Sequence, residues 1–154
     1  MNFQLNLDSE NVMHVRSGEP LCVAPTDATG DVLRQMKEMR DGGAVVCEAG
    51  KLAGIFTERD ALKVIAGQDD LDAPISQHMT AKPASINSSQ SVGTAIRSMS
   101  TGGYRRLPIV DDEGTVVGIL KVSHILRYLV EHFPEFVYNL PPTPNHTTQE
   151  REGA

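Results

Sequence analysis

The chain contains an internal duplication, and this feature constrains its fold more than any other. Residues 19–36 align with residues 82–99 at an offset of 63, and residues 44–66 align with residues 108–130 at an offset of 64. The identical residues are Pro20, Gly30, Arg34 and Met36 in the first alignment, and Gly50, Gly54, Ile55 and Leu62 in the second. Two blocks in the same order rarely arise by chance, so the chain is a duplication.

Both copies predict the same order of elements, β-α-β-β-α, from their apolar patterns. The expected strands are 21–23, 44–47 and 52–56 in the first copy, and 84–86, 107–110 and 116–120 in the second. The apolar residues expected on the helices are Val32, Leu33, Met36, Met39, Ala61, Leu62 and Ile65, and then Val92, Ala95, Ile96, Met99, Ile125, Leu126 and Leu129. We expect the one-residue change of offset in the turns between the aligned blocks, at 41–43 and 101–103.

The fold class that this order predicts is α+β, with the two repeats packed against each other. Each copy has roughly 60 residues and buries too little surface to be stable alone. The expected organisation is an N-terminal extension (1–14), the first repeat (15–66), a connector (67–78), the second repeat (79–132) and a partly disordered C-terminal tail (133–154).

The composition argues against nucleic acid and the membrane as partners of the chain. The formal net charge of −6 argues against nucleic acid, and no apolar run approaches the roughly 20 residues that cross a bilayer. The N-terminus has neither the basic start nor the apolar stretch of a secretory signal, so we expect a cytoplasmic protein. Cys22 and Cys47 each lie in an apolar run, which favours reduced, buried thiols.

The last strand of the first repeat runs into its last helix as GIFTERD (54–60), and the second repeat contains RRLPIVD (105–111). Met79-Thr80, just before the second repeat, fits the same pattern. With the duplication and the order of elements, these strings resemble the CBS-domain family over residues 15–132. The resemblance implies a stand-alone pair of tandem CBS domains about a pseudo-twofold axis, with two clefts between the repeats.

Members of this family bind AMP, ADP or ATP in such clefts, or S-adenosylmethionine or a dinucleotide, and some have no known ligand. Two pairs commonly join as a disc-like homodimer, and the pairs regulate a partner protein without doing chemistry. The resemblance therefore implies a regulatory adenine-nucleotide sensor that is not an enzyme, requires no cofactor, and acts on an effector protein that the sequence does not name.

By this resemblance, Thr57 and Asp60 hold the ligand of the first cleft, beside Ile55 and Phe56 of the same string. A carboxylate accepts hydrogen bonds from both hydroxyls of a ribose, and a threonine at a helix start lies beside free backbone N–H groups that attract phosphate. The alternative is structural, because Thr57 and Asp60 also have the spacing of a helix capping box.

The opposite wall of the first cleft is expected from the second repeat. The resemblance assigns Arg106 to the phosphates, because a guanidinium binds phosphate oxygens in a bidentate way. Arg105 is expected at the rim or turned toward the other cleft, since adjacent residues of a strand face opposite sides. The remaining expected wall residues are Tyr104, Thr80, Lys82 and Ala84.

The second cleft departs from the pattern, because Lys121 replaces the threonine and His124 replaces the aspartate. Neither side chain accepts two hydroxyl hydrogen bonds as a carboxylate does. We expect this cleft to be empty or to bind weakly, with Lys121 able to attract an anion. For His124 a surface position is expected, with a role in sensing pH as the alternative.

Two alternatives to a nucleotide sensor stay open. One is a ligand-free dimerisation or interaction module in which Thr57 and Asp60 only cap a helix, and the other is a cleft for S-adenosylmethionine or a dinucleotide. Enzyme classes find little support, because the chain has no P-loop, catalytic triad or metal-ligand spacing, and its five histidines are scattered.

Overall fold

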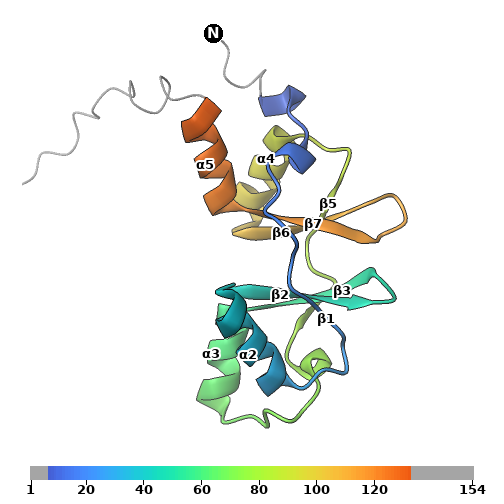
Figure 1. The fold of residues 1–154 in the computed structure, drawn as a ribbon, viewed down its shortest axis with the longest axis vertical. Coiled ribbons are helices and arrows are strands. Elements are labelled where there is room, and N and C mark those ends of the chain that lie inside the picture. Colours follow the sequence, from blue (N-terminus) through green and yellow to red (C-terminus); the bar gives the residue numbers. More distant parts are fainter. Residues whose placement is uncertain (1–6, 133–154) are drawn as a thin grey trace, which may run out of the picture.

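Each copy of the duplication forms a small β-sheet with two helices in the computed structural model, which describes residues 7–132 (Figure 1). The first repeat contains β1 (Cys22–Val23), α2 (Thr29–Met39), β2 (Gly43–Glu48), β3 (Lys51–Thr57) and α3 (Glu58–Gly67). The second contains β5 (Ile86–Asn87), α4 (Val92–Gly102), β6 (Arg106–Val110), β7 (Val116–Lys121) and α5 (Val122–His132). The predicted α+β class and β-α-β-β-α order are therefore confirmed in both copies. The expected tail (133–154) lies outside the described residues.

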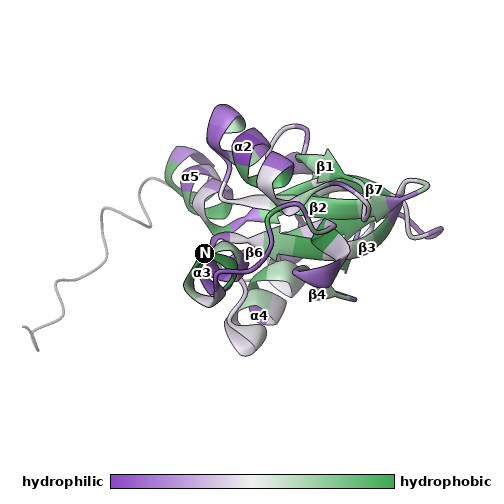
Figure 2. Cartoon of the chain, turned by 90° about the horizontal axis from the view of Figure 1, so that it is seen from below, coloured by the Kyte–Doolittle hydropathy of each residue, from purple (hydrophilic) through white to green (hydrophobic). Residues whose placement is uncertain are grey.

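The two sheets lie next to each other, with the four helices on one side of the molecule and the two hairpins on the other (Figure 1). In the first sheet β1 pairs parallel with β2, and β2 pairs antiparallel with β3. In the second sheet β5, β6 and β7 repeat this arrangement. Hydrophobic residues gather along the strands, and polar residues lie on parts of α2 and α5 and in the loops (Figure 2).

The segment that leads into each repeat packs on the other repeat. We call residues 7–17 and 75–82 the leading segments. β4 (Thr80–Ala81) extends the first sheet by pairing with β3, while Ser17 forms a bridge with Ile119 of the second sheet. The short helix η1 (Val12–His14) contributes Val12 to the core of the second repeat, and η2 (Ile75–Gln77) contributes Ile75 to the core of the first. The two repeats thus exchange segments.

The strand register corrects the predicted position of the one-residue insertion. Ala44 pairs with Phe56, and Leu107 pairs with Leu120. Because Phe56 and Leu120 are equivalent at an offset of 64, Ala44 is equivalent to Leu107, at an offset of 63. The extra residue therefore lies in the β6–β7 turn rather than in the turn before the hairpin, so the expected position was wrong. A turn of different length preserves the pairing, and it makes Arg106 the equivalent of Gly43.

The apolar residues expected on the helices divide between the core and the surface. Val32, Val92 and Ala95 have no exposed surface, as their spacing predicts. Met39, Leu62, Ile65 and Leu126 were expected on the same apolar faces, but they are 54%, 67%, 61% and 57% exposed. On α3 the core contacts come from Ala61, as expected, and from Val64, so an apolar strip of this helix faces solvent.

The prediction of buried thiols was wrong for Cys22, which is exposed, while Cys47 is half-buried. Cys22 points outward because Val23 takes the core-facing position of this two-residue strand. Burial and the neighbouring Cys22 raise the pKa of the Cys47 thiol to about 12, so this thiol stays protonated at neutral pH.

Within residues 7–132, no helix has the length and apolar composition that a membrane span requires.

Candidate functional site

Thr57 and Asp60 lie together where β3 runs into α3. Asp60 is only 9% exposed, and its Oδ2 accepts hydrogen bonds from the Thr57 backbone N at 3.0 Å and from Thr57 Oγ1 at 3.2 Å. This is the helix-capping interaction that the spacing also predicted. Because both hydrogen bonds fall on Oδ2, the second oxygen of the carboxylate remains as an acceptor for a ligand.

The strand before Thr57 presents alternate residues to two faces. Phe56 is completely buried in the core of the first repeat, so its side chain cannot contact a ligand as expected, and only its backbone remains available. The side chain of Ile55 lies on the other face of β3. In the sheet, Ile55 is the antiparallel partner of Thr80 in β4. Lys82 follows in the same segment, and its backbone N donates to the Ala53 carbonyl at 3.3 Å.

Three charged residues meet where the two repeats touch, and we call them the seam cluster. Asp41 belongs to the first repeat, and its Oδ1 lies 3.1 Å from Lys121 Nζ and 3.7 Å from Arg106 Nη2 of the second repeat. Lys121 and Arg106 are direct cross-strand partners of β7 and β6. The sequence assigned them to different clefts, whereas the structure brings them to the same carboxylate.

Arg106 also reaches toward the start of α3. A Cβ added to Gly42 would lie 2.6 Å from Arg106 Nη2 and 2.5 Å from Glu58 Oε1, so these two charged atoms are near neighbours. Glu58 is the first residue of α3, and its backbone N donates to the Gly42 carbonyl. The guanidinium of the second repeat therefore lies close to the helix start that carries Thr57 and Asp60.

The other expected wall residues are less closely involved. Tyr104 is 43% exposed and follows α4, with its ring beside Gly102 at the end of that helix. Arg105 is exposed, and its carbonyl accepts from the Val122 backbone N at the start of α5. Ala84 packs against the core of the second repeat. None of the three has a contact with Asp60 among those found in residues 7–132.

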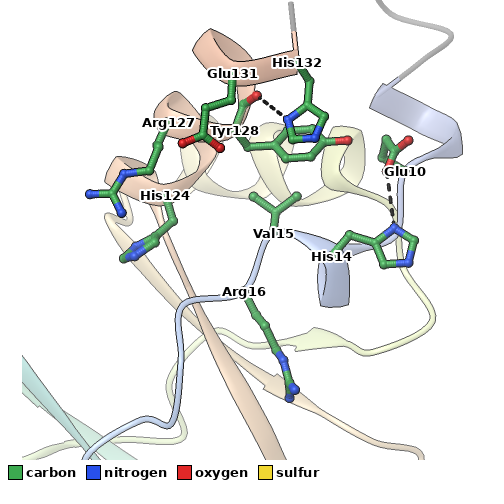
Figure 3. A pocket seen from close by; sticks show the side chains of 9 residues that line it. All are labelled: Glu10, His14, Val15, Arg16, His124, Arg127, Tyr128, Glu131 and His132. Carbon is green, nitrogen blue, oxygen red and sulfur yellow. Dashed lines mark hydrogen bonds and ion pairs between the residues drawn. The ribbon is translucent and has the colours of Figure 1, made fainter.

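A hollow of about 490 Å³ lies beside His124, at the position equivalent to Asp60 (Figure 3). Its walls are the leading segment before the first repeat and the outer face of α5. The charged and titratable side chains that line it are Glu10, His14, Arg16, His124, Arg127, Tyr128, Glu131 and His132. Three histidines that are scattered in the sequence therefore meet here, yet residues 7–132 contain no group of side chains suited to hold a metal ion.

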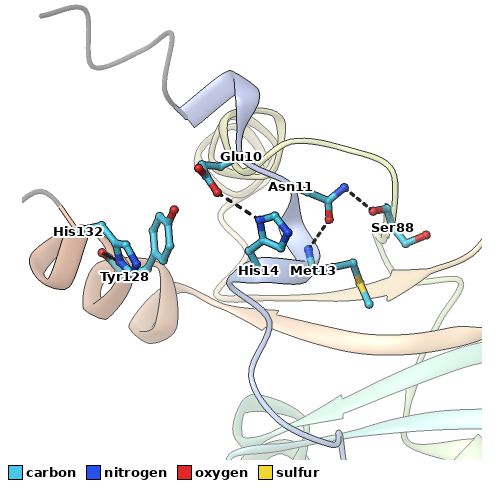
Figure 4. A network of polar contacts seen from close by, with 7 residues as sticks. All are labelled: Glu10, Asn11, Met13, His14, Ser88, Tyr128 and His132. Atoms are coloured by element: carbon cyan, nitrogen blue, oxygen red, sulfur yellow. Dashed lines mark hydrogen bonds and ion pairs between the residues drawn. The ribbon is translucent and has the colours of Figure 1, made fainter.

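A network of polar contacts lies in and beside this hollow, where the leading segment meets the second repeat (Figure 4). His14 Nδ1 lies 3.3 Å from Glu10 Oε2, and this contact lowers the pKa of the Glu10 carboxyl. Asn11 Nδ2 donates to the Ser88 carbonyl at 2.9 Å. His132 stacks on Tyr128 with 4.1 Å between ring centroids. The contact of Asn11 with Ser88 links the leading segment to the second repeat, and so does the hydrogen bond between the side chains of Glu10 and Tyr128.

His124 is half-buried rather than on the surface as expected. Its Nδ1 is buried and has no hydrogen-bond partner within the described chain. Burial lowers the pKa of His124, and the positive charges of Arg127 and Lys121 lower it further, against an opposing effect of Asp41. The imidazole is therefore neutral at neutral pH, and it offers no carboxylate to a ribose.

Asp41 is the residue that sequence reasoning missed, because it was assigned to the turn at 41–43. No local signal distinguishes it from other aspartates in turns. Its proximity to Arg106 and Lys121 depends on the packing of one repeat against the other, which the sequence order does not specify.

Comparison with known proteins places these observations in a family context. The model of the CBS domain matches residues 12–67 and again residues 75–131. An uncharacterized protein of Methanopyrus kandleri is 32% identical over 133 residues, covering 82% of this chain and 68% of the relative.

Two solved structures share the fold. A CBS domain protein from Pyrobaculum aerophilum complexed with AMP has a TM-score of 0.71 and 22% identity, covering 79% of this chain and 98% of that one. A CBS domain pair in complex with 5′-methylthioadenosine and S-adenosyl-L-methionine has a TM-score of 0.70 and 24% identity, covering 77% and 98%. At these identities the likeness establishes a common fold.

Proposed function

Because the chain belongs to the CBS-domain family, with one CBS domain in each repeat, we propose that it is a cytoplasmic regulatory module that binds an adenine nucleotide. The nucleotide is AMP, ADP or ATP, and it occupies the first cleft, between Asp60 of the first repeat and Arg106 of the second. The module does no chemistry itself and acts on an effector protein. The AMP complex of the related Pyrobaculum aerophilum protein supports this ligand class.

The observation that carries the proposal is the nearly buried carboxylate of Asp60 in the first turn of α3, with Arg106 of the other repeat near Glu58, the first residue of that helix. A ribose presents two hydroxyl donors. One suits the Asp60 oxygen that accepts no hydrogen bond from Thr57, and the other suits Oδ2 once the carboxylate has rotated. Phosphates suit the backbone N–H groups of the helix start and the guanidinium of Arg106. A nucleotide in this position touches both repeats, so its binding favours one packing of the repeats over others.

Two other functions compete with this one. Asp60 suits any adenosine compound, and the related structure with S-adenosyl-L-methionine favours including that ligand in the test. A dinucleotide has the same adenosine and adds phosphates. The hydrogen bonds from Thr57 to Asp60 favour instead a ligand-free interaction module, in which this pair only caps α3.

Titration by calorimetry with AMP, ADP, ATP and S-adenosylmethionine separates these functions. We expect saturable binding of a phosphate-bearing nucleotide at about one ligand per chain, and weaker binding of S-adenosylmethionine, which lacks phosphate. The same ligand should raise the melting temperature, because a ligand that binds only the folded state stabilises it. Flat titrations with all four compounds would favour the ligand-free module, and two ligands per chain would show that the second cleft also binds.

We further propose that two chains form a homodimer through the exposed apolar residues of α3 and α5. Leu62, Ile65 and Leu126 are each more than half exposed, although they lie on helices that also face the core. Leu62 and Ile65 lie three residues apart on one face of α3, and exposed apolar surface is typical of an interface. Leu62→Lys with Leu126→Lys should convert a dimer to a monomer in sedimentation velocity. Leu71→Lys is the matched control, since Leu71 is 45% exposed but lies in the connector; a wild-type monomer would contradict the proposal.

A further inference from the structure

Asp41 forms the ion pairs that join the two repeats among the residues that the structure describes. Its side chain is 13% exposed, and those of Lys121 and Arg106 are 18% and 24% exposed. Charges that are this far removed from solvent are screened only weakly, so they interact more strongly than surface pairs. Within the seam cluster one carboxylate faces two cations, and the Glu58 carboxylate also lies near Arg106, beside Gly42. Among the described residues, Asp41 is the acidic residue that forms an ion pair with both cations.

The contact with Arg106 is incomplete. Its Nη2 lies 3.7 Å from Asp41 Oδ1, which is longer than a strong charged hydrogen bond of about 2.7–2.9 Å. The Nε of the same guanidinium is buried and has no hydrogen-bond partner among residues 7–132. A buried donor without an acceptor is unfavourable, so Asp41 does not satisfy all the hydrogen-bonding groups of Arg106, even with the Glu58 carboxylate nearby. Lys121, in contrast, is held at 3.1 Å by Asp41.

From these contacts we propose that Asp41 is an internal competitor for the phosphates of the bound nucleotide. In the ligand-free chain its carboxylate neutralises part of the charge of Arg106 and Lys121, and a phosphate that reaches these cations must share them with Asp41 or displace it. Asp41 thereby lowers the affinity for nucleotides, and it does so more strongly when more phosphates extend into the seam cluster. This inference rests on the proposed function, because it concerns the phosphate end of the same cleft.

The test compares Asp41→Asn with the wild type, using adenosine, AMP, ATP and inorganic tripolyphosphate in calorimetry. Asparagine has nearly the same shape and still accepts a hydrogen bond from Lys121, so the fold is preserved while the negative charge is lost. We expect ATP and tripolyphosphate to bind about tenfold tighter, AMP to gain less, and adenosine to be unchanged. Asp31→Asn is the matched control, because it makes the same change of net charge on an exposed pair with Arg34 and should have no effect.

Each outcome decides between the inference and the proposed function. If Asp41→Asn binds adenosine and ATP more tightly by the same factor, or binds ATP no more tightly than the wild type does, the role of Asp41 is overturned. Nucleotide binding itself would then stand. If no adenosine compound binds either protein, the proposed function fails, and tripolyphosphate then decides the inference. If tripolyphosphate binds Asp41→Asn more tightly than it binds the wild type, the competition is supported. If it binds both proteins equally, or binds neither, the competition is contradicted.

Discussion

Asp60→Asn is expected to abolish nucleotide binding while the protein stays folded. The amide oxygen of asparagine can still accept the hydrogen bond from the Thr57 backbone N, so the start of α3 keeps its cap. The ribose hydroxyls, however, lose a charged acceptor, and hydrogen bonds to charged groups contribute about 1.5–3 kcal/mol each. Two such bonds correspond to an affinity loss of about 100-fold or more. Calorimetry measures the affinity, and thermal unfolding checks the fold.

The duplication supplies the matched control for this substitution. His124 occupies the position equivalent to Asp60 in the second repeat, so His124→Asn makes the corresponding change in the other cleft. We expect that variant to bind nucleotide as the wild type does. If Asp60→Asn also binds normally, Asp60 serves only as a helix cap, and the ligand-free interaction module becomes the better account of the chain.

The architecture was predictable because it depends on local patterns that the duplication shows twice. The hairpin glycines Gly50 and Gly114 adopt positive φ angles of 77° and 82°, as tight turns require. The strands that the apolar runs predicted appear within about two residues at each end. Two copies of one pattern support each other, so an error in one copy is visible against the other.

The position of the insertion was not predictable from identities alone. Residues at offset 64 happened to align without a gap across the hairpin turn, whereas hydrogen bonding pairs Ala44 with Phe56 and Leu107 with Leu120. Strand pairing is a contact between segments, and sequence alignment of the two copies does not measure it. The same reason explains why the meeting of Asp41, Arg106 and Lys121 had to come from the structure.

The burial of side chains was only partly predictable, in strands as well as in helices. Phe56 was expected to contact a ligand but lies in the core, at the end of a run of three buried residues, Gly54, Ile55 and Phe56. On α3 and α5 an apolar strip extends beyond the core-facing residues, and the helical period alone does not reveal which part of the strip is covered. Leu62 and Leu126 occupy equivalent positions of the duplication, and both are exposed. Repeated exposure at equivalent sites is the physical basis for the proposed dimer.

The largest effect on stability is expected from the equivalent core residues Phe56 and Leu120. Both are completely buried, each in the core of its own repeat. Truncation to alanine leaves a cavity and removes apolar contacts, which costs about 3–5 kcal/mol for Phe56→Ala and about 2–5 kcal/mol for Leu120→Ala. Domains of this size are stable by only about 5–15 kcal/mol, so either change removes a large fraction of the total.

Both variants should lower the midpoint of the same single unfolding transition. The reason is the exchange of leading segments, since Val12 completes the core of the second repeat and Ile75 completes that of the first. Unfolding of one repeat withdraws a segment from the other, which then has too small a core to remain folded. Urea unfolding followed by circular dichroism and tyrosine fluorescence tests this, with Leu71→Ala as a control expected to shift stability by less than about 0.5 kcal/mol. Two separate transitions, with Phe56→Ala lowering the midpoint of one and Leu120→Ala that of the other, would mean that the exchanged segments do not couple the repeats. A nucleotide bound between the repeats would then have little means of changing one repeat through the other.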